Sequence, residues 1–322
     1  MQDTPLPSTI LAMLTEPERI QLARLDTPLE SYAGVLPDRE LLVKRDDLTG
    51  SGLSGNKIRK LEYLIAEALS HGCKRLVTCG GIQSNHCRAT VLAAAKVGLE
   101  AKVYLRTNAP PRDATAYRGN LALMHMAGAS IEFVDADWYA ERDQNMSLNA
   151  VPHDYVIPEG GSNALGAWGY ISAIAELHTQ LQSKPSAIIV ATGSGGTVAG
   201  IELGLRLYDL HDIPVYGVCA CDDEPYFQQA CSRITYEAHQ IWPELDAIPP
   251  GQFKFIEGYV GLGYALSTPE EREELHCIMR RCGLVLDPVY TNKAFRALVH
   301  EPDRFGHQPL FIHTGGIFGL LA

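Results

Sequence analysis

The hydrophobic residues of the chain follow two spacings in turn, one typical of helices and one typical of short buried strands. Residues 57–71 place apolar side chains three or four positions apart, which predicts an amphipathic helix that stops at Gly72. An apolar run at 75–79 predicts a buried strand, and an alanine-rich segment from His86 to Val97 predicts a second helix. The same alternation predicts a strand and turn at 156–161, strands at 101–105, 130–134, 187–191, 214–220 and 309–313, and helices near 115–127, at 166–182 and at 198–208.

This alternation of strands and helices implies an α/β protein with a mostly parallel sheet that helices cover. A further helix is predicted where Thr268 and Glu271 form a capping box around Pro269. The polar stretch 135–155 is interpreted as a crossover between two halves of the chain. Residues 222–268 form the least regular region, which we expect to carry loops over a site.

The charge and composition exclude several classes of protein. The formal net charge is −11 and no long basic cluster occurs, so a nucleic-acid partner is not expected. No apolar run approaches the ~20 residues that a membrane-spanning helix needs, and residues 1–10 lack the basic start of a secretory signal. The eight cysteines contain no Cys-x-x-Cys pair, which argues against a zinc site and favours reduced thiols. We therefore expect a cytoplasmic protein without a bound metal.

A glycine-rich turn at 192–197 (TGSGGT) follows one predicted strand and precedes a predicted helix. Backbone N–H groups in such a turn can approach an anion closely, and the start of a helix adds positive potential. A dinucleotide fingerprint would need glycine in place of Val198, and the chain lacks the Gly-Lys-Ser/Thr of a P-loop. The turn therefore favours a single phosphate monoester. The alternative is a glycine-rich turn with no ligand.

Lys57 stands directly after Ser54-Gly55-Asn56, at the start of the predicted helix 57–71. Positive backbone potential and partial burial would disfavour its ammonium form, and a neutral amine can form an imine with an aldehyde. Arg59 and Lys60 are expected to add to this effect. Taken alone, the letters favour a solvated basic helix start instead, because most lysines lie at the surface.

A second turn, GGIQSNH at 80–86, also lies between a predicted strand and a predicted helix. Its hydroxyl, amide and backbone N–H groups suit a carboxylate. An N-cap role for Ser84 or Asn85 is an equally good interpretation, and a lone histidine such as His86 is more often structural. Tyr264 and Tyr290 are candidates to orient or protonate a substrate, with a position in the core or at its rim as the simpler alternative.

Six motifs in order resemble the D-cysteine desulfhydrase and 1-aminocyclopropane-1-carboxylate (ACC) deaminase family: SGNKIRKLEY, GGIQSNH, IPEGGSNALGAWGY, ATGSGGTVAG, DPVYTNKA and FIHTGG. The likeness covers nearly the whole chain, from about Thr27 to Gly316. Such proteins are fold-type II pyridoxal-phosphate enzymes related to the tryptophan synthase β-subunit, with two open, twisted, mostly parallel sheets covered by helices. The resemblance also implies a homodimer, and a large cofactor-binding domain of residues 1–59 and 159–322 beside a small domain of residues 60–158.

The resemblance assigns a role to each matching residue. Lys57 matches the lysine that holds pyridoxal 5'-phosphate as a Schiff base, and Thr314 matches the hydroxyl residue that meets the pyridine nitrogen. Asn85 matches the residue beside the phenolic oxygen of the cofactor, and Tyr264 and Tyr290 match two active-site tyrosines; these three are also expected to contact substrate. The remaining matches are Thr192, Gly193, Ser194, Gly195, Gly196 and Thr197 for the phosphate cradle, and Gln83, Ser84 and His86 for the substrate-carboxylate loop, where the serine is also a candidate for proton transfer.

The family chemistry implies a lyase that eliminates a β-substituent from a small amino acid. The amine of Lys57 removes the Cα proton, the cofactor takes up the electrons, and the product hydrolyses to pyruvate and ammonia. ACC deaminases resemble one another in carrying glutamate directly after the tyrosine at position 290, where this chain has Thr291. We therefore expect D-cysteine as substrate, with sulfide as the other product. The alternatives are an ACC deaminase, a cysteate sulfo-lyase-like enzyme and a pyridoxal-phosphate-binding protein without turnover.

Overall fold

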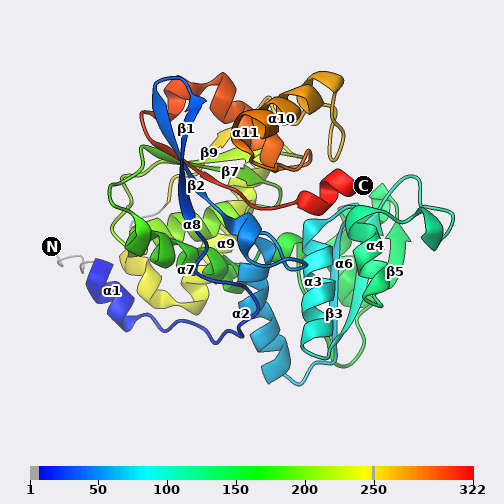
Figure 1. Cartoon of the computed structure of the whole chain (residues 1–322). Helices are drawn as coiled ribbons and strands as arrows, with labels where there is room; N and C mark the ends of the chain where they lie inside the picture. The colour runs from blue at the N-terminus through cyan, green and yellow to red at the C-terminus, as the bar shows by residue number, and fades with distance from the viewer. Residues whose placement is uncertain (1–6, 249–250) are drawn as a thin grey trace.

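The strands of the protein form two separate sheets (Figure 1). The computed structural model describes residues 7–248 and 251–322. The larger sheet has the strand order β1-β2-β10-β7-β8-β9 and the smaller has the order β5-β4-β3-β6; every neighbouring pair is parallel except the β1–β2 hairpin. The strands are β1 (Leu29–Leu36), β2 (Arg39–Lys44), β3 (Arg75–Gly81), β4 (Glu100–Arg106), β5 (Ser130–Val134), β6 (Asp154–Val156), β7 (Ala187–Thr192), β8 (Val215–Cys219), β9 (Lys254–Ile256) and β10 (Pro309–Ile312).

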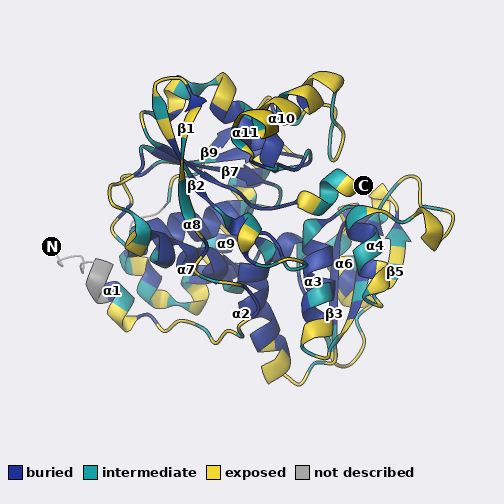
Figure 2. Ribbon diagram, in the orientation of Figure 1, coloured by how far each residue is buried: buried dark blue, intermediate teal, exposed yellow. Residues whose placement is uncertain are grey.

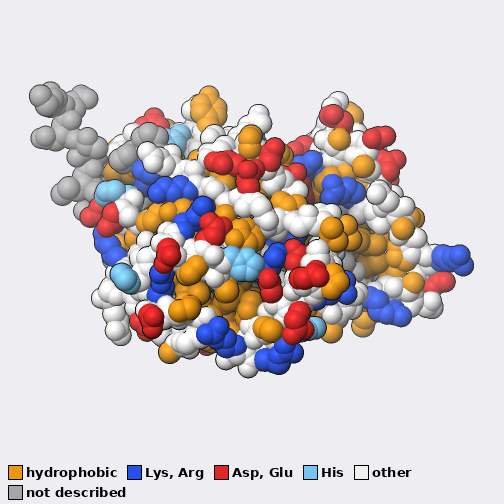
Figure 3. Space-filling model, turned by 90° about the horizontal axis from the view of Figure 1, so that it is seen from above, with side chains coloured by type: hydrophobic (Ala, Val, Ile, Leu, Met, Phe, Trp, Pro, Cys, Tyr) orange, Lys and Arg blue, Asp and Glu red, His pale blue; other side chains and the backbone are white. Residues whose placement is uncertain are grey.

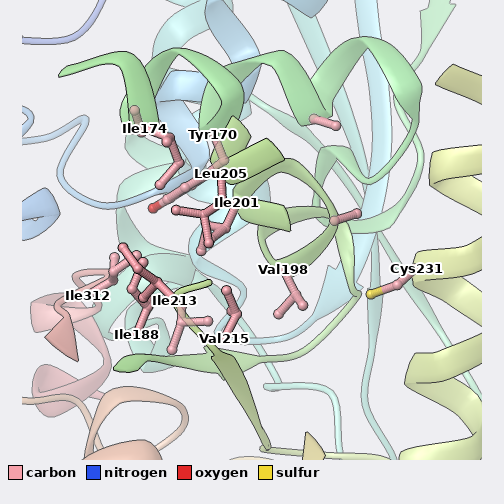
Figure 4. Packing of buried hydrophobic residues seen from close by; sticks show 14 of the residues in the cluster. Tyr170, Ile174, Ile188, Val198, Ile201, Leu205, Ile213, Val215, Cys231 and Ile312 are labelled. Atoms are coloured by element: carbon pink, nitrogen blue, oxygen red, sulfur yellow. The ribbon is translucent and has the colours of Figure 1, made fainter. Parts of the chain in front are cut away.

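Helices cover both faces of the larger sheet, because its central strands are apolar on both sides. Along β7, Ile188 and Val190 pack with α7 and α8, whereas Ile189 and Ala191 pack with α11 on the other face. Figure 4 shows the first of these layers, with Ile188 and Val215 of the strands beneath side chains of α7 and α8. The α-helices are α1 (Pro7–Met13), α2 (Lys57–Ser70), α3 (Asn85–Lys96), α4 (Gly119–Met126), α5 (Ala136–Ala140), α6 (Arg142–Leu148), α7 (Ala164–Gln180), α8 (Gly196–Leu207), α9 (Glu224–Ile241), α10 (Pro269–Cys282) and α11 (Thr291–His300).

The smaller sheet has a hydrophobic core on each of its faces. Leu76 and Val103 pack with α2, α3 and α4 on one face. Val77 and Tyr104 pack on the other face with residues of α5 and α6. The buried residues of the two sheets form two dense regions, with exposed residues concentrated on the outer helices and loops (Figure 2). Each sheet is therefore the centre of its own layered core.

Most of the predicted elements are present, and the α/β class with two mostly parallel sheets is confirmed. Strand β5 coincides with the predicted range 130–134. The capping box that starts α10 is also confirmed, because Thr268 Oγ1 accepts from the N–H of Glu271 at 3.2 Å and Glu271 Oε2 accepts from the N–H of Thr268 at 2.9 Å. All eight cysteines are free thiols.

The region 222–268, which was expected to be the least regular, contains α9, a helix of 18 residues that was not predicted. Asp223 caps this helix by accepting from the N–H of Tyr226, and a proline stands in its first turn. Phe227 and Ile234 face the core at a helical spacing, which is a signal that the sequence contained. Residues 249 and 250 of this region lie outside the described part of the chain.

Three further features were not predicted as elements. The polar stretch 135–155 contains the short helices α5 and α6 and most of strand β6. The β1–β2 hairpin was missed because β1 is largely exposed and lacks a regular alternation of buried residues. Its turn is tight, with Asp38 in the left-handed region at φ 53°. Helix α11 was missed because its first turn was treated only as part of a site motif.

A buried network of charges joins the start of α2 to the larger sheet and to α7. Arg59 donates to Asp46 at 2.7 Å and to Glu176 at 2.9 Å, and all three side chains are at most 5% exposed. Lys44 of β2 pairs with the same Glu176, and the Tyr170 hydroxyl donates to Asp46 at 2.6 Å. Because buried charges are tolerated only when paired, this network fixes the position of α2 relative to α7.

The predictions made from composition concern membrane spans, charge and location. No helix in the described ranges is both long enough and apolar enough to cross a membrane. On the face shown in Figure 3, basic side chains are scattered among acidic ones. The first six residues, which belong to the segment examined for a secretory signal, lie outside the described residues. The compartment and the domain boundaries at 59/60 and 158/159 stay predictions.

Candidate active site

A cavity lies where the turns after β3 and β7 meet the first residue of α2. It brings together residues that are far apart in the sequence, because the carboxyl ends of parallel strands point to a common edge. Eleven of the fourteen predicted site residues line it. These are Lys57, Ser84, Asn85, His86, Thr192, Gly193, Ser194, Gly195, Thr197, Tyr290 and Thr314. Asn56, Glu159, Gly160, Ala191 and Val198 complete the lining.

Lys57 is the first residue of α2 and its amine faces the cavity. Within the described ranges, no group accepts a hydrogen bond from its Nζ. Burial lowers the pKa of this amine to about 8, while the carboxylate of Glu159 acts in the opposite direction. Arg59 does not contribute as predicted, because its charge is paired with Asp46 and Glu176. The alternative of a solvated helix start is therefore wrong.

The lowered pKa of Lys57 predicts how cofactor loading depends on pH. The neutral amine is the form that attacks an aldehyde, so its fraction should rise with pH through about 8 rather than through the ordinary value near 10.5. We expect the rate at which the apoprotein gains visible absorbance with pyridoxal phosphate to show a midpoint near pH 8. Glu159→Gln should move this midpoint lower, since the lost carboxylate favours the ammonium. A midpoint that stays fixed in this variant, while exposed Glu141→Gln serves as control, would contradict the assignment.

The glycine turn at 192–197 lacks room for side chains and leaves a helix start uncapped. A Cβ on Gly193 would lie 2.7 Å from the Tyr290 ring, and one on Gly196 would lie 2.6 Å from Ser162 Oγ. Gly195 has φ +82°, which favours glycine. It occupies the N-cap position of α8 without any side-chain capping bond, so the first amides of this helix remain available to an anion. The turn therefore fits a phosphate group.

Asn56, Lys60 and Ser162 also contact each other or the residues of this turn. Sequence reasoning gave none of these three a part in holding a phosphate. The Ser162 and Ser194 hydroxyls lie 2.9 Å apart, and Asn56 Nδ2 donates to Thr197 Oγ1 at 3.1 Å. Lys60 is fully buried and donates to Gly160 O at 3.2 Å and to Ser162 Oγ at 3.3 Å, with no carboxylate partner among the described residues. Burial, with Lys57 nearby, lowers the pKa of Lys60 well below its ordinary value, so its amine is a hydrogen-bond donor beside the turn, and a bound phosphate would favour its charged form.

The turn at 80–86 has the N-cap function that was considered for it, and its role in holding a substrate carboxylate stays a prediction. Ser84 is the N-cap of α3, because its Oγ accepts from the N–H of Cys87 at 3.1 Å, and it also lines the cavity. Asn85 Oδ1 accepts from Asn120 Nδ2 at 3.0 Å. Burial, with the nearby lysines, lowers the pKa of His86 well below its ordinary value, so its ring is neutral. Its Nε2 lies 2.9 Å from the Thr78 hydroxyl and its buried Nδ1 has no partner in the described chain.

Three predicted residues do not line the cavity. Gln83 is turned toward α4, where its Oε1 accepts from the N–H of Asn120 at 2.9 Å. Gln83 and Tyr264 line a larger, neighbouring cavity instead, and Gly196 of the glycine turn lines neither cavity. The role of Gln83 in holding a substrate carboxylate stays a prediction.

The two predicted tyrosines form a pair at the boundary between the two cavities. The ring centroids of Tyr264 and Tyr290 lie 6.0 Å apart with the planes at 69°. Gly81 and Gly193 make room for them, because an added Cβ would lie 2.4 Å from Tyr264 Cε1 and 2.7 Å from Tyr290 Cε1, respectively. Burial raises the pKa of both hydroxyls, so both are neutral proton donors.

Thr314 and Glu159 also line the cavity. The Thr314 carbonyl accepts from the N–H of Asn56 at 3.1 Å, which places this residue directly beside the start of α2. Glu159 forms an ion pair with Arg142 at 2.9 Å and accepts from the Tyr139 hydroxyl at 2.5 Å. Sequence reasoning gave no role to Glu159, although it lies in the motif IPEGGSNALGAWGY.

A family model described as pyridoxal-phosphate-dependent enzyme matches residues 20–315. The chain belongs to this family. Among curated relatives, the mitochondrial bifunctional D-cysteine desulfhydrase/ACC deaminase of Arabidopsis thaliana is 39% identical over 93% of this chain and 78% of that protein. A putative ACC deaminase of Thermotoga maritima is 39% identical over 94% of this chain and 98% of its own length. The resemblance inferred from the six motifs is confirmed, and this pyridoxal-phosphate enzyme is a member of the D-cysteine desulfhydrase and ACC deaminase group.

Solved structures agree with the fold of this pyridoxal-phosphate enzyme. The structure of an ACC deaminase homologue superposes with a TM-score of 0.83 at 34% identity and covers 98% of this chain and 96% of that one. A fungal L-serine ammonia-lyase from Rhizomucor miehei superposes with a TM-score of 0.65 at 18% identity, covering 92% and 95% of the two chains. The second likeness shows the fold alone.

Pyridoxal phosphate is the cofactor of this enzyme family, and the cavity has the groups that would hold it. An unpaired amine with a lowered pKa, Lys57, faces the space in which the aldehyde would lie. The uncapped start of α8 and the glycine turn suit the phosphate. Thr314 lines the same cavity with a neutral hydroxyl. The alternative of a glycine turn without a ligand is therefore dropped.

Proposed function

We propose that this enzyme eliminates the thiol of D-cysteine, giving pyruvate, sulfide and ammonia with consumption of one water molecule. The observation that carries the proposal is the placement of Lys57, with its lowered pKa, at the edge of a cavity that also contains an uncapped helix start. When bound, pyridoxal phosphate stabilises negative charge at Cα. Loss of a β-substituent is the elimination chemistry typical of this enzyme group.

The choice of D-cysteine over ACC rests on the residue after Tyr290. ACC deaminases resemble one another in having glutamate there, and here Thr291 is buried with its hydroxyl donating to Asp287 at 2.7 Å. Glu159 is the one carboxylate that lines the described cavity, and Arg142 and Tyr139 hold it. The cavity therefore lacks the acid that the other branch carries. The bifunctional name of the Arabidopsis relative makes ACC the second candidate substrate.

Different residues of this chain would carry out different parts of the reaction. We assign to Lys57 the holding of the cofactor and the removal of the Cα proton, since its amine is neutral above about pH 8. The carboxylate of the substrate would lie at the start of α3, beside Ser84 and Asn85. Tyr290 and Tyr264, which are protonated at neutral pH, would orient the substrate and supply a proton to the leaving thiolate.

A comparison of products tests the proposal directly. Pyruvate should form from D-cysteine and β-chloro-D-alanine with a higher specificity constant than from L-cysteine or cysteate. 2-Oxobutyrate should form from ACC with a lower specificity constant than pyruvate from D-cysteine. The opposite ranking would make the protein an ACC deaminase, and sulfite from cysteate as the preferred reaction would make it a sulfo-lyase. Sulfide and pyruvate in a one-to-one ratio are the expected signature.

Two further expectations concern the assembly and the location of the protein, the first from the resemblance and the second from the composition. A homodimer is proposed, and light scattering of the holoenzyme across a range of concentrations tests it. A cytoplasmic location is also proposed, although the name of the Arabidopsis relative places that protein in mitochondria. Fractionation of cells that express the chain tests this second expectation.

A further inference from the structure

Lys293 of α11 is a buried lysine that has no part in the proposed reaction. Its side chain is 1% exposed. Its ammonium donates to three backbone carbonyls: Val260 at 2.7 Å, Ala220 at 2.9 Å and Gly263 at 3.0 Å. An ammonium has three donors, so these contacts use all of its hydrogen-bonding capacity. Three carbonyls from two separate segments of the chain thus converge on one positive charge.

No carboxylate pairs with this charge in the part of the chain that the structure describes. Burial lowers the pKa of Lys293, while Glu271 and Asp287 act at a distance to favour the charged form. Arg296, which also lies nearby, is paired with Glu271 and Glu274. Carbonyl dipoles therefore stabilise the ammonium, much as rings of backbone carbonyls stabilise an alkali cation.

Two of the three carbonyls belong to the loop that carries Tyr264. This loop, residues 257–267, is anchored at its start, where Tyr259 is buried and donates to Glu301 at 2.8 Å, whereas the part nearer Tyr264 is more exposed. Leu262 is 65% exposed and Leu266 is 55% exposed. Gly261, Gly263 and Ala265 have positive φ values. Two internal hydrogen bonds, donated by Gly263 N to Val260 O and by Leu266 N to Gly263 O, are both 3.3 Å long. The contacts of Lys293 with Val260 and Gly263 therefore hold the residues directly before Tyr264.

Lys293 also connects this loop to the other tyrosine and to the glycine turn. Tyr290 stands one helical turn before Lys293, so one element presents one tyrosine and holds the loop of the other. The third carbonyl, that of Ala220, precedes Cys221, whose thiol contacts Gly193 O at 3.5 Å. A single ammonium thus links the loop of Tyr264, the segment that contacts Gly193 and the helix that follows Tyr290.

We propose that Lys293 is a positioning residue that acts as a built-in cation, holding the loop of Tyr264 at the distance from Tyr290 that the reaction needs. This inference rests on the proposed function, because it assumes that Tyr264 acts on the substrate. The rival view is that Lys293 only stabilises the fold. The two views differ in what a small external cation does after the side chain is removed, because a cage of carbonyls can accept potassium whereas a lost packing contact cannot be restored by it.

The test compares Lys293→Met holoenzyme with Lys184→Met, in which the lysine removed is exposed and paired with Asp212. We expect kcat for pyruvate formation to fall about 100-fold in Lys293→Met, since a displacement of about 1 Å in a positioned group has effects of this size. KM and the visible absorbance of bound cofactor should change little. Potassium chloride, against choline chloride at equal ionic strength, should restore much of kcat in this variant and leave the wild type unchanged.

A second measurement does not depend on turnover. Amide hydrogen exchange in residues 257–267 of the Lys293→Met holoenzyme should speed up, and potassium should slow it again. This readout distinguishes failure of the inference from failure of the proposed function, which would appear as a wild type that releases no pyruvate. If Lys293→Met does not fold, Lys293→Arg replaces it, because a planar guanidinium cannot direct three bonds to the same point. An unchanged kcat in either variant, or a lost kcat and fast exchange that potassium leaves unaltered in Lys293→Met, would overturn the proposal.

Discussion

Lys57→Ala is expected to lower pyruvate release from D-cysteine by about 10³-fold or more, because it removes both the attachment of the cofactor and the base at Cα. The variant should also lose the visible absorbance of the holoenzyme. Its fold should remain, because the Lys57 amine makes no hydrogen bond within the described ranges and faces a cavity. Steady-state assays and absorbance spectra of purified protein measure both effects.

Lys60→Ala provides the matched control for this experiment. Lys60 lies one helical turn away and is also buried, but its amine points to Gly160 and Ser162 rather than into the cavity. We expect this second variant to bind pyridoxal phosphate more weakly and to regain activity with excess cofactor, which Lys57→Ala should not do. Borohydride reduction of the wild type followed by peptide mapping should label Lys57. A label on any other lysine would refute the assignment.

Arg59→Met is expected to lower the free energy of unfolding by about 3–5 kcal/mol, the range for removing one partner of a buried charge network. The loss arises because Asp46 and Glu176 would keep their negative charges in a dry interior with only Lys44 left to balance them. Urea denaturation of the apoprotein measures the change, which should appear in the midpoint rather than the slope.

The surface pair of Arg233 with Glu237 offers the control for Arg59. Arg233→Met should change the free energy of unfolding by no more than about 0.5 kcal/mol, since that arginine is half exposed and its pair spans a single helical turn. The network also predicts a direction with pH. The pKa of Asp46 is lowered in the folded protein, so its contribution is present above its unfolded pKa and is lost as the pH falls through the folded value. Equal effects of both arginine variants would contradict the importance given to the network.

The sequence predicted the fold wherever the hydrophobic spacing was regular over a whole element. The strand at 130–134 and the capping box at Thr268 were located to the residue, because both have strong local signals. The β1–β2 hairpin gave no such signal, since β1 is exposed over most of its length and becomes a strand only through its pairing with β2. Helix α9 did carry a helical spacing, at Phe227 and Ile234, and this spacing was not recognised.

The candidate site could be predicted only where a motif carried it. From its local sequence alone, Lys57 could not be distinguished from a surface lysine. The order of the six motifs reversed that interpretation. Glu159 and Lys60 could not be assigned in this way, since their roles depend on contacts across about a hundred residues of chain. Glu159 acquires its charge environment from Lys57 and Arg142, and Lys60 acquires its role from Ser162. Such pairings exist only after both sheets have formed.

The two-sided packing of β7 has a consequence for attempts to alter this protein by laboratory evolution. Ile188 and Ile189 pack against opposite helical layers. A larger or smaller side chain at either position therefore strains the core on its side of the sheet. The strand would pass this strain on to the glycine turn that follows it. Libraries directed at new substrates should therefore leave 187–192 intact. Variation is better tolerated in the exposed stretch around Leu262 and Leu266. This stretch borders the larger, neighbouring cavity and belongs to neither of the two helical layers.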